Sequence, residues 1–373
     1  ELFVFQKKIG WRLDNRGHLH AFTMEFFPLL IRDYSRRLGN NDPSLTDLNL
    51  KCAGMSDEKF FEPILRGLHK NNQVQIVDLY GNDLADGVES FASILSANKS
   101  IRVLKLDRNR INCESVKCIA KGLESNSTIE EITMDDNEIG PDGAEAFAEM
   151  LRNNKSIKKI SLRSNRVGNR GSIALFNGLK DNTSVEQVCL SFNDIKGLEV
   201  ANALRDLLQT NHTIKIFRIW GNSLGATGGE KVAKGLEQNH GLQELYLGQT
   251  DMGDDGAIAF GDALRKNKTL KKLYLYRNAI GTKGAMGLAS GLRLNLTLET
   301  LKLGLFEEQD ENYCKAIREI MYWLQLNRSG RQNVYEHAIS LPYPLWAHVF
   351  ASVSEQPEVL NYFLRAKPDL FIS

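Results

Sequence analysis

The sequence predicts an α/β solenoid, a stack of similar units that each contain a short strand followed by a helix. Three observations support this fold class: a period of about 28 residues, one strand-like pattern of apolar residues in each period, and a helix-like pattern between the strands. Successive starts lie 27 to 29 residues apart, at Leu45, Val74, Ile101, Ile129, Ile157, Val185, Ile214, Leu242, Leu270 and Leu298. We therefore expect a horseshoe with parallel strands on the concave face, helices on the convex face and a helical cap at each end.

The strand part of the unit is clearest in Leu270–Ile280, which reads LKKLYLYRNAI. This spacing of apolar residues before an asparagine is the leucine-rich repeat signature. Because side chains alternate between the faces of a strand, Leu273 and Leu275 should enter the core while Tyr274 and Tyr276 face outward. The asparagine should pair the backbone groups of the sharp turn that follows. Its column reads Asn82, Asn109, Asn137, Asn165, Asn193, Asn222 and Asn278, with Ala53, Thr250 and Phe306 as exceptions.

The second part of each unit has the 3.6-residue apolar period of a helix. In Gly140–Leu151, small or apolar residues fall on one face at Ala144, Phe147, Ala148 and Leu151. A second asparagine, such as Asn154, ends each helix, where we expect a left-handed backbone conformation. Seven of the eight N-x-[ST] sequons fall at this position, so the repeat explains them without glycosylation.

These residues make the chain resemble the ribonuclease-inhibitor-like subfamily of leucine-rich repeats, over residues 44–305. That subfamily includes the Ran GTPase-activating protein and the repeat domains of NOD-like receptors. The resemblance implies a curved binding scaffold. It does not define the function, because proteins of this subfamily have many different functions.

Composition narrows the class of protein without naming a partner. The chain has 373 residues, 42% of them hydrophobic and 25% charged, with a net charge of +1 that favours neither nucleic acid nor an anionic membrane. No apolar run approaches the length of a membrane span. The five scattered cysteines favour a reducing intracellular compartment, the cytoplasm in the first place. An organelle is the alternative, because the N-terminus lacks an initiator Met and reads as trimmed.

The two ends of the chain depart from the repeat. Residues 1–43 are expected to form an N-terminal cap, with a short strand and turn near Trp11 and a helix over residues 22–38. Residues 44–305 are expected to hold about ten repeats. Residues 306–373 are expected to form a C-terminal helical cap or tail that begins with a helix over residues 310–327; a partner-docking motif is the alternative.

Catalytic patterns are missing from the sequence. It contains no phosphate loop, no HExxH, no GxSxG and no paired CxxC. His212 and His240 occupy the same position in neighbouring repeats, but no cysteine or carboxylate completes a ligand set. We therefore expect no enzyme activity, no cofactor and no metal.

The outward side of the strands is the predicted contact surface. Exposed Trp, Tyr and Arg dominate binding energy at protein interfaces. The early repeats present acids there, at Asp78, Asp107, Asp135 and Asp136. The predicted partner-binding residues combine aromatic rings with arginines: Tyr80, Arg163, Phe192, Arg218, Trp220, Tyr246, Tyr274, Tyr276 and Arg277.

Three functions are compatible with this surface. The first is a non-enzymatic scaffold that grips a protein partner of unknown identity in its concavity, with no role for nucleic acid or membrane insertion. The second is a structural subunit docked through its ends or its convex helices. The third is a Ran-type GTPase activator, for which Arg108 or Arg110 would supply the catalytic arginine. The sequence does not define the oligomeric state.

Overall fold

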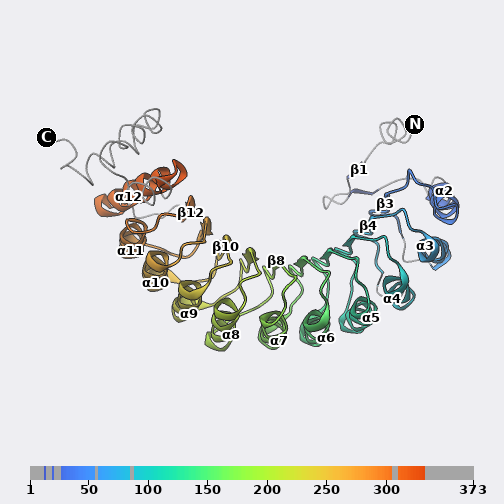
Figure 1. Cartoon of the computed structure of the whole chain (residues 1–373), viewed down its shortest axis with the longest axis horizontal. Helices are drawn as coiled ribbons and strands as arrows, with labels where there is room; N and C mark the ends of the chain where they lie inside the picture. Colours follow the sequence, from blue (N-terminus) through green and yellow to red (C-terminus); the bar gives the residue numbers. More distant parts are fainter. Residues whose placement is uncertain are drawn as a thin grey trace, which may run out of the picture. The chain divides into compact units, whose positions relative to one another are not determined.

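The computed structural model describes residues 12–13, 19–20, 27–54, 58–84, 88–304 and 310–331. The chain divides into two compact units, Glu1–Asp194 and Ile195–Ser373. Each unit alternates short parallel strands with helices, and in each unit the described helices lie along one side of the strands (Figure 1). The predicted α/β leucine-rich-repeat solenoid is confirmed at this level.

The first unit pairs six of its strands in parallel, in chain order from β3 to β8. A separate antiparallel pair, β1 with β2, precedes them. The elements of this unit are β1 (Arg12–Leu13), β2 (Leu19–His20), α2 (Phe27–Gly39), β3 (Asp47–Asn49), α3 (Glu58–Lys70), β4 (Ile76–Asp78), α4 (Val88–Ala97), β5 (Val103–Lys105), α5 (Cys113–Glu124), β6 (Glu131–Thr133), α6 (Gly140–Asn153), β7 (Lys159–Ser161), α7 (Gly168–Lys180) and β8 (Gln187–Cys189).

The second unit repeats the pattern with four parallel strands, β9 to β12. Their register places each residue beside the residue 28 positions further along the chain, so Tyr246 lies beside Tyr274. The elements of this unit are α8 (Leu198–Thr210), β9 (Ile216–Arg218), α9 (Gly225–Gln238), β10 (Glu244–Tyr246), α10 (Gly253–Lys266), β11 (Lys272–Tyr274), α11 (Thr282–Leu292), β12 (Thr300–Lys302) and α12 (Glu311–Arg328).

The core of each unit lies between its strands and its helices. The middle residue of each strand is buried, as at Leu245 and Leu273, and Leu275 joins them with an exposed fraction of 0%. On α6 the predicted face, including Phe147 and Leu151, is buried. Tyr274 and Tyr276 keep part of their surface exposed, as the alternation along the strand predicts.

The asparagine column at the strand exits forms a ladder. The side-chain oxygen of Asn137 accepts hydrogen bonds from the backbone N–H groups of Asn109 (2.8 Å) and Ile111 (3.0 Å), one repeat earlier. Its amide nitrogen donates to the carbonyls of Leu106 (3.0 Å) and Met134 (2.9 Å). One buried amide thus pairs backbone groups from two repeats, as predicted. Phe306, where the column was predicted to end, lies outside the described residues.

The asparagines that end the helices form a second ladder, but the left-handed backbone predicted for them is wrong. Asn154 has φ −69° and ψ 131°, which is extended backbone. Its amide nitrogen donates to the carbonyls of Leu123 and Asn126, and its side-chain oxygen accepts from the N–H groups of Ser156 and Ile157. The side chain thus ties the end of α5 in the preceding repeat to the segment that leads into the next strand, while the Asn154 backbone N–H bonds its own helix at Met150. All eight sequon asparagines are buried, which accords with a structural role.

The described ends of the chain follow their predicted helices. Helix α2 begins at Phe27, and residues 22–26 of the predicted helix lie outside the described residues. Helix α12 begins one residue later than predicted, because the Asp310 side chain caps it by accepting from the Tyr313 N–H. Asn327 donates to the carbonyls of Asn295 and Leu298, so α12 continues the second ladder. The division into cap, repeats and tail remains a prediction, and residues 332–373 lie outside the described residues.

All five cysteines are free, with Cys52 exposed and the other four partly exposed. Among the helices that the structure describes, none combines the length and apolarity that crossing a membrane requires.

Candidate functional site

Five predicted contact residues meet in the second unit, and we call them the aromatic cluster: Arg218, Trp220, Tyr246, Tyr274 and Tyr276. The Arg218 guanidinium lies 4.7 Å from the ring centroid of Tyr246. Tyr246 stacks on Tyr274 with centroids 4.2 Å apart and planes 6° apart. Tyr274 contacts Tyr276 at 5.8 Å, and Tyr276 contacts Trp220 at 5.9 Å. The five side chains therefore form one continuous surface.

The strands explain why these side chains gather. Arg218, Tyr246 and Tyr274 are the last residues of β9, β10 and β11, and the parallel register aligns them. Trp220 and Tyr276 each lie two residues before a ladder asparagine, in repeats that are separated by one intervening repeat. All five side chains are partly exposed and none is buried.

Gly248 lets Trp220 and Tyr276 meet across that intervening repeat. It occupies the position equivalent to Trp220 and Tyr276, and it has no side chain to separate them. A Cβ atom placed on Gly248 would lie 2.9 Å from Tyr276 Cδ2 and 3.2 Å from Trp220 Cδ1. Both distances are closer than carbon atoms normally approach, so any larger residue would part the two rings.

A charged pair supports the cluster from the start of the same strands. Glu244 accepts hydrogen bonds from Lys272 Nζ (2.8 Å) and from the Tyr246 hydroxyl (2.7 Å), one on each carboxylate oxygen. Burial alone would raise the pKa of Glu244, but these two hydrogen bonds hold that pKa below its ordinary value. Burial and the Glu244 carboxylate raise the pKa of Tyr246, which fixes its hydroxyl as a donor. The Tyr246 ring is thus held in one orientation.

The other predicted contact residues are placed elsewhere. In the first unit, Arg163 lies 5.2 Å from the Phe192 ring centroid, and Arg108 lies 5.7 Å from that of Tyr80. In the second unit, Arg277 is exposed on the turn after Tyr276, with φ 55°. The structure therefore gathers five of the nine predicted residues. Of the other four, Arg163 and Phe192 pair with each other, Tyr80 pairs with Arg108, and Arg277 lies on a turn.

The acidic positions of the first unit are bonded within the unit. Asp78, at an outward strand position, is only 3% exposed because it pairs with Lys51 (3.2 Å) and Lys105 (3.6 Å), so its carboxylate is covered and not presented to a partner. Asp107 accepts from the Thr133 hydroxyl and the Asp135 N–H. Asp135 accepts in turn from Ser161 (2.6 Å) and from the Arg163 N–H (2.8 Å). These acids stabilise the turns of the solenoid.

Sequence reasoning missed three residues that complete the cluster: Gly248, Glu244 and Lys272. Glu244 and Lys272 occupy the first outward position of their strands, whereas the predicted contact residues lie at the last outward position and just after it. The two-residue alternation would have placed both beside Tyr246 and Tyr274. Gly248 carries no comparable signal, because a glycine near a turn is expected for backbone reasons alone.

Comparison with known families follows the repeats described above. A TMOD/LMOD leucine-rich domain profile matches residues 30–174, and a leucine-rich repeat profile matches residues 238–261 and 266–289. The chain is a leucine-rich-repeat protein. Leucine-rich-repeat families are in general non-enzymatic scaffolds for binding other proteins. No curated protein sequence matches this leucine-rich-repeat protein, and its likeness to the ribonuclease-inhibitor-like subfamily remains a prediction.

Solved structures of other leucine-rich-repeat proteins are also similar to it. Leiomodin-1 actin-binding site 2 shares 19% identity over 50% of this chain and 91% of that one, with a TM-score of 0.32. The tropomodulin C-terminal domain of Caenorhabditis elegans shares 12% over 48% and 92%, with a TM-score of 0.32. The LegL7 protein of Legionella pneumophila shares 15% over 77% and 93%, with a TM-score of 0.46. At these identities the likeness concerns the fold alone.

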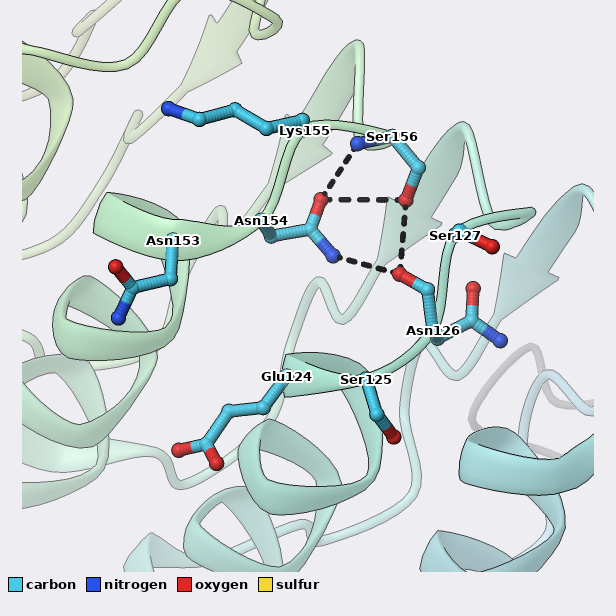
Figure 2. Close-up of a pocket in the computed structure, with 8 residues that line it drawn as sticks. All are labelled: Glu124, Ser125, Asn126, Ser127, Asn153, Asn154, Lys155 and Ser156. Atoms are coloured by element: carbon cyan, nitrogen blue, oxygen red, sulfur yellow. Dashed lines mark hydrogen bonds between the residues drawn. The ribbon is translucent and has the colours of Figure 1, made fainter.

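One hollow of about 310 Å³ lies where helices α5 and α6 end (Figure 2). Asn154 and Ser156 line it, and both bond the Asn126 carbonyl, so the polar groups seen there belong to the second ladder. The predicted histidine pair has ring centroids 5.5 Å apart, and His212 Nδ1 accepts from the His240 N–H. Within the described residues, no group of three or more metal-binding side chains occurs. Neither place offers this leucine-rich-repeat protein a better site than the aromatic cluster.

Proposed function

We propose that this protein is a non-enzymatic scaffold that binds a protein partner through the strand face of its second unit, centred on the aromatic cluster. The observation that carries this proposal is the continuous contact from Arg218 through Tyr246, Tyr274 and Tyr276 to Trp220, all on partly exposed side chains. The buried leucines on the other side of the strands already form the core, so folding alone does not require aromatic residues here.

The physical argument is that this surface combines large contact area with low ordering cost. Trp, Tyr and Arg supply most of the binding energy at protein interfaces. Tyrosine and tryptophan have few rotatable bonds, and mutual contact already restricts them before a partner arrives. The hydrogen bond from Tyr246 to Glu244 adds to this restriction. Tyr80, Arg163 and Phe192 remain predicted contact residues of the first unit, supported by their ring–guanidinium pairs.

GTPase activation receives less support from the side chains. An activating arginine must reach the transferred phosphate. Arg108 instead bonds Asp136 (3.2 Å), and Arg110 bonds Asp83 (3.0 Å). The alternative of a structural subunit docked through its helices is supported by apolar side chains exposed on helices of the second unit, among which Met321 on α12 is 62% exposed; the others are Leu198, Ile258 and Met286. The free cysteines accord with our proposal that the protein acts in a reducing compartment of the cell.

The test is affinity capture from native extract with two matched double variants. Trp220→Ala plus Tyr276→Ala removes half of the aromatic rings of the cluster, and we expect it to lose the captured partner. Met321→Ala plus Tyr322→Ala alters the surface of helix α12, and we expect it to keep the partner. Mass spectrometry compares recovery, and circular dichroism confirms that both variants fold. Loss in the second variant with retention in the first would favour the structural-subunit function instead.

A further inference from the structure

The four strands of the second unit carry an excess of positive charge. Strands β9 to β12 contain twelve residues, among which Arg218, Lys272 and Lys302 are basic and Glu244 alone is acidic. The described turns that follow β10 and β11 add one exposed residue of each sign, Asp251 and Arg277. The face that holds the aromatic cluster is therefore cationic, although the chain as a whole has a net charge of only +1.

The carboxylate on these strands does not neutralise the excess. Both oxygens of Glu244 are occupied, one by Lys272 Nζ and the other by the Tyr246 hydroxyl. Among the described residues, Arg218, Arg277 and Lys302 form no ion pair with a carboxylate. Arg218 rests on the Tyr246 ring instead, 4.7 Å from its centroid. Lys302 is the register partner of Tyr274, and Arg277 directly follows Tyr276 in the chain. Three cations next to members of the aromatic cluster thus keep hydrogen-bonding capacity for a partner.

We propose that the partner contacts this face with an acidic peptide segment that also carries an apolar or aromatic side chain. Its carboxylates would meet Arg218, Arg277 and Lys302, and its apolar side chain would pack on the aromatic cluster. Charge complementarity of this kind selects partners and accelerates association. This inference rests on the proposed function, because it names the chemistry of the partner for the same surface.

Single-stranded nucleic acid is the other anionic polymer that uses aromatic rings, and the geometry favours it less. Bases bind by stacking on open ring faces along a basic groove. Here Tyr246 and Tyr274 already stack on each other at 4.2 Å, which leaves no slot for a base between them. The other rings contact each other at tilts of 52°, so the cluster offers no row of parallel ring faces.

Gly248 is a positioning residue for this recognition. Its backbone does not have the left-handed conformation that would require glycine, so alanine is compatible with the backbone. The added Cβ would nevertheless separate Trp220 from Tyr276. Gly248→Ala therefore alters the shape of the aromatic cluster while every charge on the face is kept.

The experiment measures binding of fluorescent peptides to the full chain by fluorescence anisotropy. The probe is a short glutamate-rich peptide containing phenylalanine, compared with versions in which glutamine or lysine replaces every glutamate, and with an oligothymidylate. We expect the glutamate peptide to bind most tightly, and its affinity to fall as salt rises. We expect Arg218→Gln and Lys302→Gln each to weaken binding about 5- to 10-fold, since each removes a charge-assisted contact. Gly248→Ala should weaken binding about 10-fold with an unchanged salt dependence.

Each remaining outcome overturns the inference in a different way. Equal, salt-independent binding of the glutamine peptide would show that the surface recognises apolar groups only. Tighter binding of the lysine peptide would reverse the sign of the charge argument. Tighter binding of oligothymidylate would indicate nucleic acid. If the glutamate peptide does not bind while the cluster variant still loses its captured partner, the proposed function stands and only the acidic chemistry is rejected.

Discussion

The strand faces of the two units are built on the same repeat and differ in what their outward side chains do. In the first unit, the outward acids bond to neighbours within the unit, as Asp135 does with Ser161 and the Arg163 N–H. In the second unit, the corresponding positions carry stacked rings and the cations Arg218 and Lys302, which have no ion-pair partner among the described residues. The first face stabilises itself, whereas the second leaves bonding capacity for another molecule.

Different strand positions of this solenoid serve folding and recognition. The buried strand positions and the asparagine ladders are nearly the same throughout, so they carry stability. The outward positions are free to change from one repeat to the next, because they do not contribute to the core. The repeat of Gly248 and Thr250 departs most from this pattern, and it lies beneath the meeting point of Trp220 and Tyr276.

The largest predicted loss of stability concerns the asparagine ladder at the strand exits. This ladder is the feature in which the two units should be most alike. Asn137→Ala removes the acceptor for two buried N–H groups and the donor to two carbonyls. We expect the free energy of unfolding to fall by about 3–5 kcal/mol, because several buried backbone groups lose partners together. Urea denaturation followed by circular dichroism measures the change.

Thr250→Val is the matched control in the second unit. The hydroxyl of Thr250 donates to the Leu247 carbonyl (2.8 Å), and valine keeps its shape without that bond. We expect a loss of about 1–2 kcal/mol, since one hydrogen bond disappears. A larger loss at Thr250 than at Asn137 would contradict the expectation that the asparagine amide, which pairs several backbone groups, contributes more to the strand ladder than the threonine hydroxyl.

The sequence was sufficient to predict the repeats and the strand ladder because a solenoid turns sequence distance into spatial distance. A register of 28 residues places Tyr246 beside Tyr274 without any further information. The backbone of the helix-ending asparagines was mispredicted because a left-handed turn and side-chain bonds to nearby backbone groups both favour asparagine, and the residue type does not distinguish them. The side-chain bonds of Asn154 were visible only in the structure.

The site was predictable as a set of residues but not as a surface. Alternation along the strands placed Tyr246 and Tyr274 outward, and the structure puts both there. The contact between Trp220 and Tyr276 crosses the whole repeat that lies between them. It therefore depends on side-chain rotamers and on the small size of Gly248. The burial of Asp78 between two lysines depends likewise on neighbouring repeats.

An intermediate change in stability is expected from replacing an arginine that both units place at the same repeat position. Arg108 and Arg277 both precede a ladder asparagine, and both have a left-handed φ of 55°. Arg277→Gly should raise the free energy of unfolding by about 0.5–1 kcal/mol, because glycine adopts this conformation without strain. The same change should weaken binding of the glutamate-rich peptide, since it removes a cation from the second face.

Arg108→Gly supplies the comparison in the first unit. That arginine bonds Asp136 at 3.2 Å and lies over the Tyr80 ring, so relief of strain is offset by the loss of two contacts. We expect no gain in stability from this variant and no effect on peptide binding. Equal stabilisation by both glycines in thermal denaturation would show that the arginine contacts of the first face contribute nothing.

The smallest predicted effect is on how stability depends on pH. It compares one carboxylate from the strand face of each unit, Asp135 in the first and Glu244 in the second. Burial raises the pKa of Asp135 above its ordinary value of 3.8, against the lowering effect of its bonds from Ser161 and the Arg163 N–H. Burial would also raise the pKa of Glu244, but its bonds from Lys272 and Tyr246 hold that pKa below the ordinary 4.5. The two groups should therefore contribute to stability with opposite slopes against pH.

The signs follow from which state binds the proton more tightly. Asp135 holds its proton more tightly when folded, so its contribution to stability falls as pH rises from 3.8 through the raised pKa. Glu244 holds its proton less tightly when folded, so its contribution is complete above 4.5 and is lost as pH falls through the lowered pKa. Urea denaturation of Asp135→Asn and Glu244→Gln between acid and neutral pH measures both. Relative to the parent, we expect Asp135→Asn to gain and Glu244→Gln to lose stability as pH rises, and slopes of the same sign would contradict the contrast between the two faces.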